Sequence, residues 1–276
     1  MILSGKAKIA GVMGWPVGHS RSPRLHGYWL NQYGIDGAYI PLPVSPDRFS
    51  AALAGLAAAG FRGVNVTVPH KEQAYAACTV LDDHAKRIGA VNTITFDEGG
   101  GILGSNTDAF GFIENIRQDA EWDGGISVVL GAGGAARAIC VALIDAGSAE
   151  IRIVNRTIGR AEKLAREFGP LIRVIDWDNR SDALSEASIL VNSTSLGMTG
   201  QAPLDLDLGA LPREAIVNDI VYAPLETDLL AAARARGNPV VDGLGMLLHQ
   251  ARPGFEAWFG ERPDVTQDLR QFVLNS

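Results

Sequence analysis

Polar and apolar residues alternate in one short segment, which reads Val64, Asn65, Val66, Thr67 and Val68. A strand with a period of two would bury the three valines and present Asn65 and Thr67 on the opposite face. Pro69 ends this strand, and Lys71 follows shortly after it. The pattern predicts either one wall of a polar pocket or an edge strand whose polar face is solvated.

Strands and helices alternate through the first part of the chain. The hydrophobic patterns predict strands at 6–13, 38–44 and 63–68 and helices at 23–33 and 46–60. This order favours a mostly parallel sheet with helices on its faces. A hairpin and a further helix complete this part, at 91–104 and 109–117.

A second domain is expected after the polar run 118–125. An apolar strand at 126–130 leads into Gly131-Ala132-Gly133-Gly134-Ala135-Ala136, which matches G-x-G-x-x-G/A, and an apolar helix follows. Glycines in this position allow a tight turn and let a pyrophosphate approach the N-terminus of the helix. The strand, loop and helix together predict a Rossmann-type dinucleotide-binding domain. The remaining strands are expected at 150–154, 171–175, 188–192, 215–219 and 240–241, and two closing helices at 247–259 and 266–274.

The residues at the end of the second strand of this domain indicate which of the two nicotinamide cofactors is bound. An acidic residue about 20 positions after the glycines would bind the ribose hydroxyls of NAD, but Asn155, Arg156 and Thr157 stand there instead. Arg156 and Arg160 can clamp a 2′-phosphate through charge-assisted hydrogen bonds. We therefore predict NADP, and the alternative is two solvated arginines on an exposed helix.

Polar residues also stand at two predicted helix starts in the first part of the chain. Ser20 and Ser22 precede Pro23, so they either cap the helix or hold an anion such as a carboxylate at its N-terminus. Asp108 begins the later helix, where it either caps the helix or faces a pocket beside Lys71.

Composition limits the partners and the compartment. The chain carries 24 basic and 31 acidic residues, a formal charge of −7, which argues against a nucleic-acid partner. No apolar run reaches the roughly 18 residues that a membrane helix needs, and no metal site is predicted. Cys78 and Cys140 lie in segments typical of packed helices, which suits a reducing cytoplasm. We expect a cytoplasmic monomer or homodimer.

Eight separated motifs resemble the shikimate dehydrogenase family, in the order that the family has them. They are Gly18-His19-Ser20-Arg21-Ser22-Pro23 with His26, Asn65-Val66-Thr67-Val68-Pro69-His70-Lys71, Gly89-Ala90-Val91-Asn92-Thr93, Asn106-Thr107-Asp108, the glycine loop, Asn155-Arg156-Thr157, Val221-Tyr222-Ala223-Pro224, and Asp242-Gly243-Leu244-Gly245-Met246-Leu247-Leu248-His249-Gln250. One departure is Gly27, where many relatives carry asparagine.

The resemblance implies an oxidoreductase that reversibly reduces 3-dehydroshikimate to shikimate with NADPH, on the pathway to aromatic amino acids. It implies that Lys71 and Asp108 form the catalytic pair. Substrate contacts are implied for Ser20, Ser22, Asn65, Thr67, Lys71, Asn92, Asp108, Tyr222 and Gln250. Cofactor contacts are implied for Asp83, Gly131, Ala132, Gly133, Gly134, Ala135, Asn155, Arg156, Thr157, Arg160, Thr194, Ile220 and Gly243.

The expected architecture is α/β with two domains. An N-terminal substrate domain with a mostly parallel sheet is formed by residues 1–118 plus 243–276, and a Rossmann-type NADP-binding domain is formed by residues 119–242. The active site is expected in the cleft between them.

Two other functions stay open at this level. A quinate/shikimate dehydrogenase would use NAD and accept quinate, and a non-catalytic regulator would bind NADP without turnover. The role of Lys71 is open as well, because a neutral lysine acts as a general base whereas a cationic one stabilises negative charge on oxygen.

Overall fold

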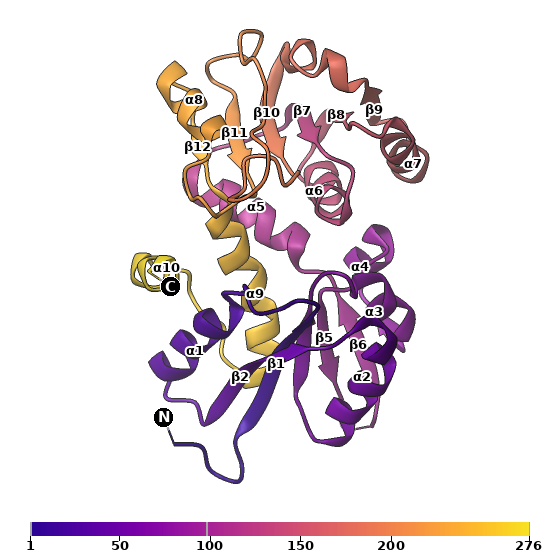
Figure 1. Ribbon diagram of the computed structural model, residues 1–276, viewed down its shortest axis with the longest axis vertical. Coiled ribbons are helices and arrows are strands. Elements are labelled where there is room, and N and C mark those ends of the chain that lie inside the picture. Colours follow the sequence, from indigo (N-terminus) through magenta and orange to yellow (C-terminus); the bar gives the residue numbers. More distant parts are fainter. Residues whose placement is uncertain (1, 98, 276) are drawn as a thin grey trace. The chain divides into compact units, whose positions relative to one another are not determined.

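The protein is an α/β chain with two compact units, each built on one six-stranded sheet (Figure 1). The structure is a computed structural model, and residues 2–97 and 99–275 are described. The first unit comprises Met1–Thr107 with Leu248–Ser276, and the second comprises Asp108–Leu247. The α/β class is confirmed. The predicted domain limits at 118 and 243 differ from these unit limits in the assignment of residues 108–118 and 243–247, and as functional boundaries they stay predictions.

The elements of the first unit follow the predicted order. They are β1 (Lys8–Gly14), α1 (Ser22–Gln32), β2 (Gly37–Pro43), the 3-10 turn η1 (Pro46–Arg48), α2 (Phe49–Ala58), β3 (Gly63–Val66), α3 (Lys71–Ala77), β4 (Val80–Leu81), α4 (Asp83–Ile88), β5 (Thr93–Phe96), β6 (Ile102–Ser105), the C-terminal part of α9 (Gly243–Phe259) and α10 (Gln267–Leu274).

The first sheet is mostly parallel, as predicted. Its strand order is β2-β1-β3-β5-β6-β4. The strand β1 pairs in parallel with β2 and β3, and β4 pairs in parallel with β6. Among the described strands of this sheet, β5 alone runs opposite to its neighbours, because the hairpin reverses the chain. Polar side chains that follow β1 and β3 therefore lie along one edge of the sheet.

The alternation along β3 is confirmed, but the predicted strand is too long. Val64 and Val66 are buried in a core with Phe49 and Leu53 of α2. Val68 was expected to be buried, and that prediction is wrong, because its side chain is 70% exposed. The strand ends at Val66, although the Thr67 N–H still donates to the Met13 carbonyl of β1 at 2.9 Å, and a cis Val68–Pro69 peptide follows.

The other face of the first sheet is covered by an aromatic cluster, which consists of His26 and Trp29 from α1, Tyr39 from β2, and Phe255 and Trp258 from α9. The His26 ring stacks on Tyr39 with 3.8 Å between centroids and 1° between planes. Within the described residues, neither ring nitrogen of His26 has a hydrogen-bond partner. Burial lowers the pKa of His26 to about 3, so this imidazole is neutral in the folded protein at neutral pH.

Replacing His26 with phenylalanine is expected to make the protein less sensitive to acid. Below its ordinary pKa of 6.5 the histidine takes up a proton in the unfolded chain, whereas in the folded protein it does so only near pH 3. In this window the free energy of unfolding therefore decreases by about 1.4 kcal/mol for each unit by which the pH is lowered. Urea unfolding should show the wild type losing about 2 kcal/mol more than His26→Phe between about pH 7.5 and about pH 5. Equal losses in both proteins would contradict the assignment.

The second unit has the order of a doubly wound nucleotide-binding domain. Its elements are α5 (Asp108–Asp119), β7 (Gly125–Leu130), α6 (Gly134–Asp145), β8 (Ser148–Val154), α7 (Ile158–Phe168), β9 (Ile172–Ile175), the 3-10 turns η2 (Trp177–Asn179) and η3 (Asp182–Leu184), β10 (Ala187–Asn192), β11 (Ile216–Asp219), α8 (Asp228–Arg236), β12 (Val240–Val241) and the start of α9. Asp242 Oδ1 accepts the Leu244 N–H at 3.0 Å, so α9 begins earlier than predicted.

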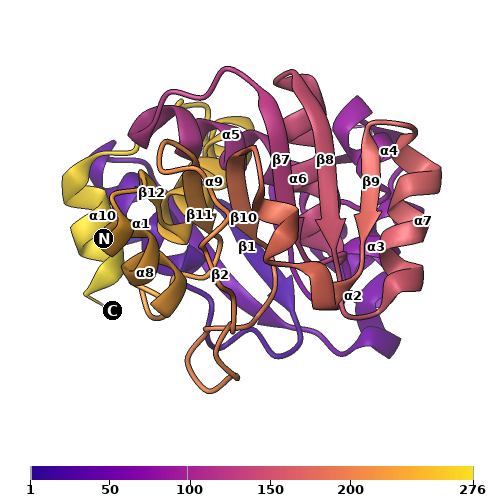
Figure 2. The same ribbon diagram turned by 90° about the horizontal axis from the view of Figure 1, so that it is seen from above.

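All pairs in the second sheet are parallel, and the strand order is β12-β11-β10-β7-β8-β9 (Figure 2). The helices α6 and α7 pack against β7, β8 and β9, whereas α8 packs against β11 and β12. The strand order reverses between β7 and β10. Open sheets of this kind bind ligands at the carboxyl ends of the strands beside such a reversal.

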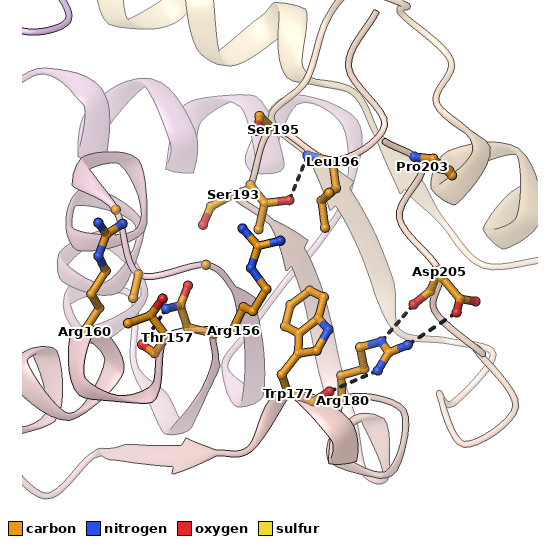
Figure 3. Close-up of a pocket in the computed structure, with 15 residues that line it drawn as sticks. Arg156, Thr157, Arg160, Trp177, Arg180, Ser193, Ser195, Leu196, Pro203 and Asp205 are labelled. Atoms are coloured by element: carbon orange, nitrogen blue, oxygen red, sulfur yellow. Dashed lines mark hydrogen bonds and ion pairs between the residues drawn. The ribbon is translucent and has the colours of Figure 1, made fainter. Parts of the chain in front are cut away.

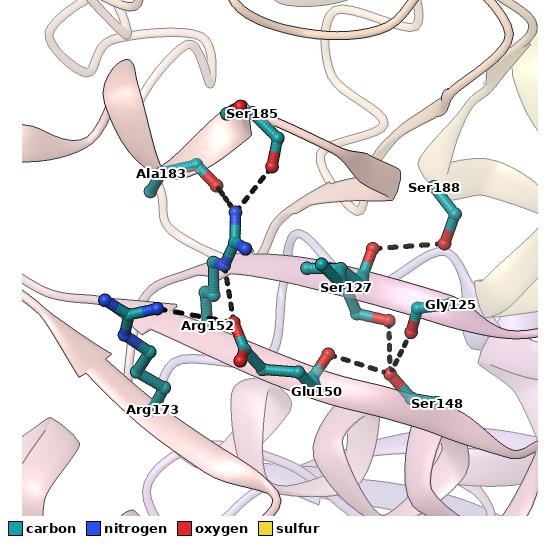
Figure 4. A network of polar contacts seen from close by, with 10 residues as sticks. Gly125, Ser127, Ser148, Glu150, Arg152, Arg173, Ala183, Ser185 and Ser188 are labelled. Atoms are coloured by element: carbon teal, nitrogen blue, oxygen red, sulfur yellow. Dashed lines mark hydrogen bonds and ion pairs between the residues drawn. The ribbon is translucent and has the colours of Figure 1, made fainter.

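A buried arginine ties the strands of the second sheet together (Figure 4). Arg152 of β8 pairs with Glu150 at 2.6 Å, and its Nη1 donates to the carbonyls of Ala183 at 2.8 Å and Ser185 at 2.6 Å. A buried charge needs such partners because its desolvation is otherwise uncompensated. The clamp links β8 to the segment that enters β10, and so holds the two strands on either side of β7. In the described part of the chain, no helix has both the length and the apolar character for crossing a membrane.

Candidate active site

A cavity of about 540 Å³ lies in the second unit, where β7, β8, β9 and β10 end. It brings together eight of the predicted cofactor residues, namely Gly131, Ala132, Gly133, Asn155, Arg156, Thr157, Arg160 and Thr194. These residues come from three separate stretches of sequence. The cavity also has walls that the sequence did not single out, formed by Trp177, Arg180, Pro203 and Asp205.

The glycine loop forms the floor of the cavity at the start of α6. Gly131 has φ of +108°, and a Cβ there would come within 2.6 Å of the Ser193 hydroxyl oxygen, so this position requires glycine. A Cβ on Gly133 would meet no protein atom within 4 Å, and no side chain caps the helix. The helix N-terminus therefore stays accessible to an anion. This arrangement fits the pyrophosphate of a dinucleotide.

Three arginines line the cavity, and they differ in their partners (Figure 3). Within residues 2–97 and 99–275, the guanidinium groups of Arg156 and Arg160 have neither a hydrogen bond nor an ion pair. Both side chains are exposed, and the neighbouring Asn155 Nδ2 donates to the Thr157 carbonyl at 2.7 Å. Two exposed guanidinium groups at this position fit a 2′-phosphate. The third arginine, Arg180, is already engaged with Asp205.

A buried polar chain holds Thr194 on the far wall of the cavity. Asn192 Oδ1 accepts hydrogen bonds from the Thr194 hydroxyl at 2.7 Å and from its N–H at 3.1 Å. Asn192 Nδ2 in turn donates to Asp219 Oδ1 at 3.0 Å, and Asp219 Oδ2 accepts from Thr227 at 2.7 Å. Burial raises the pKa of Asp219, although its hydrogen bonds oppose that shift. This series of hydrogen bonds orients the Thr194 side chain before a ligand binds.

Five predicted cofactor residues do not line this cavity. Gly134 and Ala135 lie just beyond it, in the first turn of α6. Gly243 and Ile220 are in backbone contact with each other in the second unit. Asp83 belongs to α4 of the first unit, where its 94% exposed side chain pairs with Lys86 at 3.3 Å. Their roles stay predictions.

The first unit gathers three predicted substrate residues into one hydrogen-bonded network. Asn65 Nδ2 donates to Thr93 Oγ1 at 3.0 Å, and Thr93 Oγ1 donates to Asn92 Oδ1 at 2.9 Å. Asn92 Nδ2 reaches Thr107 Oγ1 at 3.1 Å and Gln250 Oε1 at 3.5 Å. Asn65 and Asn92 are buried, whereas Gln250 is partly exposed. The network fixes the positions of these amides at the edge of the sheet.

Tyr39 belongs to this network, and sequence reasoning missed it. Its hydroxyl donates to Asn65 Oδ1 at 2.6 Å and also bonds with the Ser22 side chain. Burial raises the pKa of Tyr39, so the phenol stays protonated as a donor. With Asn65 Nδ2 committed to Asn92 and Thr93, the amide of Asn65 offers a ligand an oxygen acceptor rather than a free N–H. No polar–apolar alternation along β2 singles out Tyr39, because its neighbours Ala38 and Ile40 are apolar as well.

The two serines at the start of α1 differ from the predicted capping arrangement. Arg21 is the N-cap residue, no side chain caps the helix, and Ser22 is already its first residue. Ser20 Oγ accepts the Ser22 N–H at 3.3 Å. Ser22 is therefore not the cap, and its buried hydroxyl is turned toward Tyr39 instead.

The remaining predicted residues stand at element ends. In the first unit, Thr67 follows β3, and Lys71 is the first residue of α3. In the second unit, Asp108 is the first residue of α5, and Tyr222 follows β11. Asp108 is 9% exposed, and Lys71 is partly exposed. Their catalytic and substrate-binding roles stay predictions.

Three family models match the chain in succession. They describe a shikimate dehydrogenase substrate binding domain over residues 12–94, a shikimate / quinate 5-dehydrogenase over residues 117–198, and a shikimate 5′-dehydrogenase C-terminal domain over residues 243–271. The shikimate dehydrogenase (NADP(+)) of Paramagnetospirillum magneticum is 59% identical over 276 residues, which is 99% of this chain and 100% of the relative.

Solved structures agree over the same length. Shikimate 5-dehydrogenase from Thermus thermophilus, in complex with NADP(H) and shikimate, has a TM-score of 0.88 and 38% identity, covering 97% of this chain and 99% of that one. Quinate dehydrogenase from Corynebacterium glutamicum in complex with NAD has a TM-score of 0.90 and 29% identity, covering 98% and 99%. The fold is thus shared by NADP and NAD enzymes. With a relative of 59% identity over nearly its whole length, the chain belongs to the shikimate dehydrogenase family.

Proposed function

We propose that this protein is an NADP-dependent shikimate dehydrogenase, an oxidoreductase that interconverts shikimate and 3-dehydroshikimate on the route to aromatic amino acids. One observation supports the cofactor assignment above all others. The glycine loop and two arginines without side-chain partners among the described residues line the same cavity, with no acidic residue at the end of β8. The substrate assignment rests on family membership and on the amide network of the first unit.

Bound NADP would accept or supply the hydride. The glycine loop and the start of α6 would hold its pyrophosphate, and Arg156 and Arg160 would hold its 2′-phosphate. Ser20 and Ser22 would bind the substrate carboxylate. The amides of Asn65, Asn92 and Gln250, together with Thr67 and Tyr222, would orient the ring hydroxyls.

Lys71 and Asp108 would act at the reacting hydroxyl. Oxidation of an alcohol requires loss of the hydroxyl proton as the hydride leaves, and reduction requires a proton donor at the forming alkoxide. Lys71 would transfer that proton or stabilise the charge on the oxygen, and Asp108 would orient the lysine.

An activity grid tests the proposal directly. Shikimate and quinate would each be assayed with NADP and with NAD, following the absorbance of the reduced nicotinamide. We expect shikimate with NADP to give the highest kcat/KM. Preference for quinate with NAD would favour the related quinate enzyme, and cofactor binding without turnover of either substrate would favour a non-catalytic regulator.

We also propose that the protein is located in the cytoplasm. The two cysteines are unpaired, and Cys140 is buried, which suits the reducing cytoplasm. A monomer or a homodimer is expected, and light scattering during size-exclusion chromatography distinguishes the two.

A further inference from the structure

We propose that Trp177 forms the wall on which the adenine base of NADP stacks, and that Arg180 and Asp205 hold this wall in place. This inference rests on the proposed function, because it assigns a base-binding residue to the same cofactor. No residue of this wall belonged to the motifs that identified the family. Trp177 follows β9, the third strand from the reversal on its side of the sheet, and it lines the cavity beside Arg156.

An ion pair between Arg180 and Asp205 supports Trp177. Arg180 Nε donates to the Asp205 carbonyl at 2.8 Å, and its Nη2 reaches Asp205 Oδ2 at 3.4 Å. Its Nη1 donates to the Trp177 carbonyl at 3.1 Å, and the guanidinium carbon lies 5.3 Å from the centroid of the indole. All three nitrogens of the Arg180 guanidinium group thus contact protein oxygen atoms. Its position stiffens Trp177 through the backbone and through a cation–π contact.

The placement of the charged groups leaves the base one direction in which to lie. The glycine loop would take the pyrophosphate, and Arg156 with Arg160 would take the 2′-phosphate, so both ends of the adenosine ribose are fixed. The base then extends past the ribose toward the carboxyl end of β9, where Trp177 stands. In Figure 3 the indole is drawn between the Arg156 and Arg180 side chains.

The indole suits a flat aromatic ligand in both its burial and its surroundings. Trp177 is half-buried, and it packs against the core of the second unit that includes Leu184 and Leu208. The core and Arg180 fix its orientation, while the part that lines the cavity remains open to a ligand. Stacking of a base on an aromatic side chain is worth about 1–3 kcal/mol, which corresponds to about 5-fold to 150-fold in affinity.

Binding of adenosine 2′,5′-bisphosphate tests the wall without turnover. Its dissociation constant would be measured by calorimetry, and tryptophan fluorescence would be followed in the same titration. We expect Trp177→Ala to weaken binding about tenfold, whereas Trp177→Phe, which keeps an aromatic face, should stay within about threefold. The base should quench the fluorescence of the wild type, and most of that quenching should vanish in Trp177→Phe.

Trp122 provides the matched control. It is another tryptophan of the second unit, and it donates to Ser188 outside the cavity. Trp122→Phe should keep both the affinity and the quenching. Because Arg180 is proposed to hold the indole in place, Arg180→Met should weaken binding by about as much as Trp177→Ala does.

Each outcome bears on one proposal. Unchanged affinity in Trp177→Ala, or full quenching in Trp177→Phe, would overturn the stacking wall while leaving the dehydrogenase intact. If the wild type neither binds the bisphosphate nor oxidises shikimate with NADP, the proposed function itself fails. Circular dichroism and a thermal unfolding midpoint close to that of the wild type verify that the Trp177→Ala protein is folded.

Discussion

Replacing Lys71 with alanine is expected to lower kcat for shikimate oxidation by about 10²–10⁴-fold, the usual contribution of a general acid–base group. KM for shikimate should change only modestly, because the amides and serines carry most of the proposed substrate binding. Lys71 is the first residue of α3 and is partly exposed, so truncation should leave the fold intact. Steady-state kinetics with shikimate and NADP measures both constants.

Two further variants sharpen this test. Lys163→Ala removes an exposed lysine of α7 that pairs only weakly with Glu167, at 4.0 Å, and it should keep full activity. Lys71→Arg keeps the charge but does not release a proton at accessible pH. Activity retained in Lys71→Arg would indicate charge stabilisation, and loss equal to that of alanine would favour proton transfer. Near-normal turnover in Lys71→Ala would remove this lysine from the mechanism.

Replacing Arg156 and Arg160 together with alanine is expected to raise KM for NADP about 100-fold, because two charge-assisted hydrogen bonds of about 1.5–3 kcal/mol each are lost. Solvent exposure of both side chains reduces their separate contributions, so the double variant is the informative one. KM for NAD should change by less than about threefold, since NAD lacks the 2′-phosphate. The selectivity between cofactors, given by the ratio of kcat/KM values, should therefore collapse.

Arg166 serves as the control for this experiment. It lies in the last turn of α7, the helix that begins just before Arg160, and it does not line the cavity. Arg166→Ala should keep the preference for NADP. If the double variant still prefers NADP as strongly as the wild type, another group must recognise the 2′-phosphate.

The sequence was most informative where backbone geometry restricts residue type. Gly131 requires a positive φ and a close approach to Ser193, so the glycine loop could be identified from composition and order alone. The two arginines could be assigned because a carboxylate is missing from a position that NAD enzymes need. Each of these features is local, within one loop and the helix beside it.

Contacts between distant segments could not be predicted in the same way. Trp177 and Asp205 line the same cavity although they are far apart in the sequence, and Arg180 contacts both of them. Tyr39 meets Asn65 only because β1 lies between their strands with a particular register. Val68 showed the opposite error, since an apolar pattern continued past the point where the strand stops. Register and strand ends depend on tertiary packing, which periodicity does not contain.

The stacking of His26 on Tyr39 has a consequence for how this enzyme can adapt to heat. Tyr39 is at once a member of the aromatic core and the hydrogen-bond donor to Asn65. A repacked core that moved its ring by a fraction of an ångström would also shift the amide that is proposed to meet the substrate. Thermal stability and substrate affinity are therefore tied to the same phenol, and substitutions selected for one property in this cluster should be screened for the other.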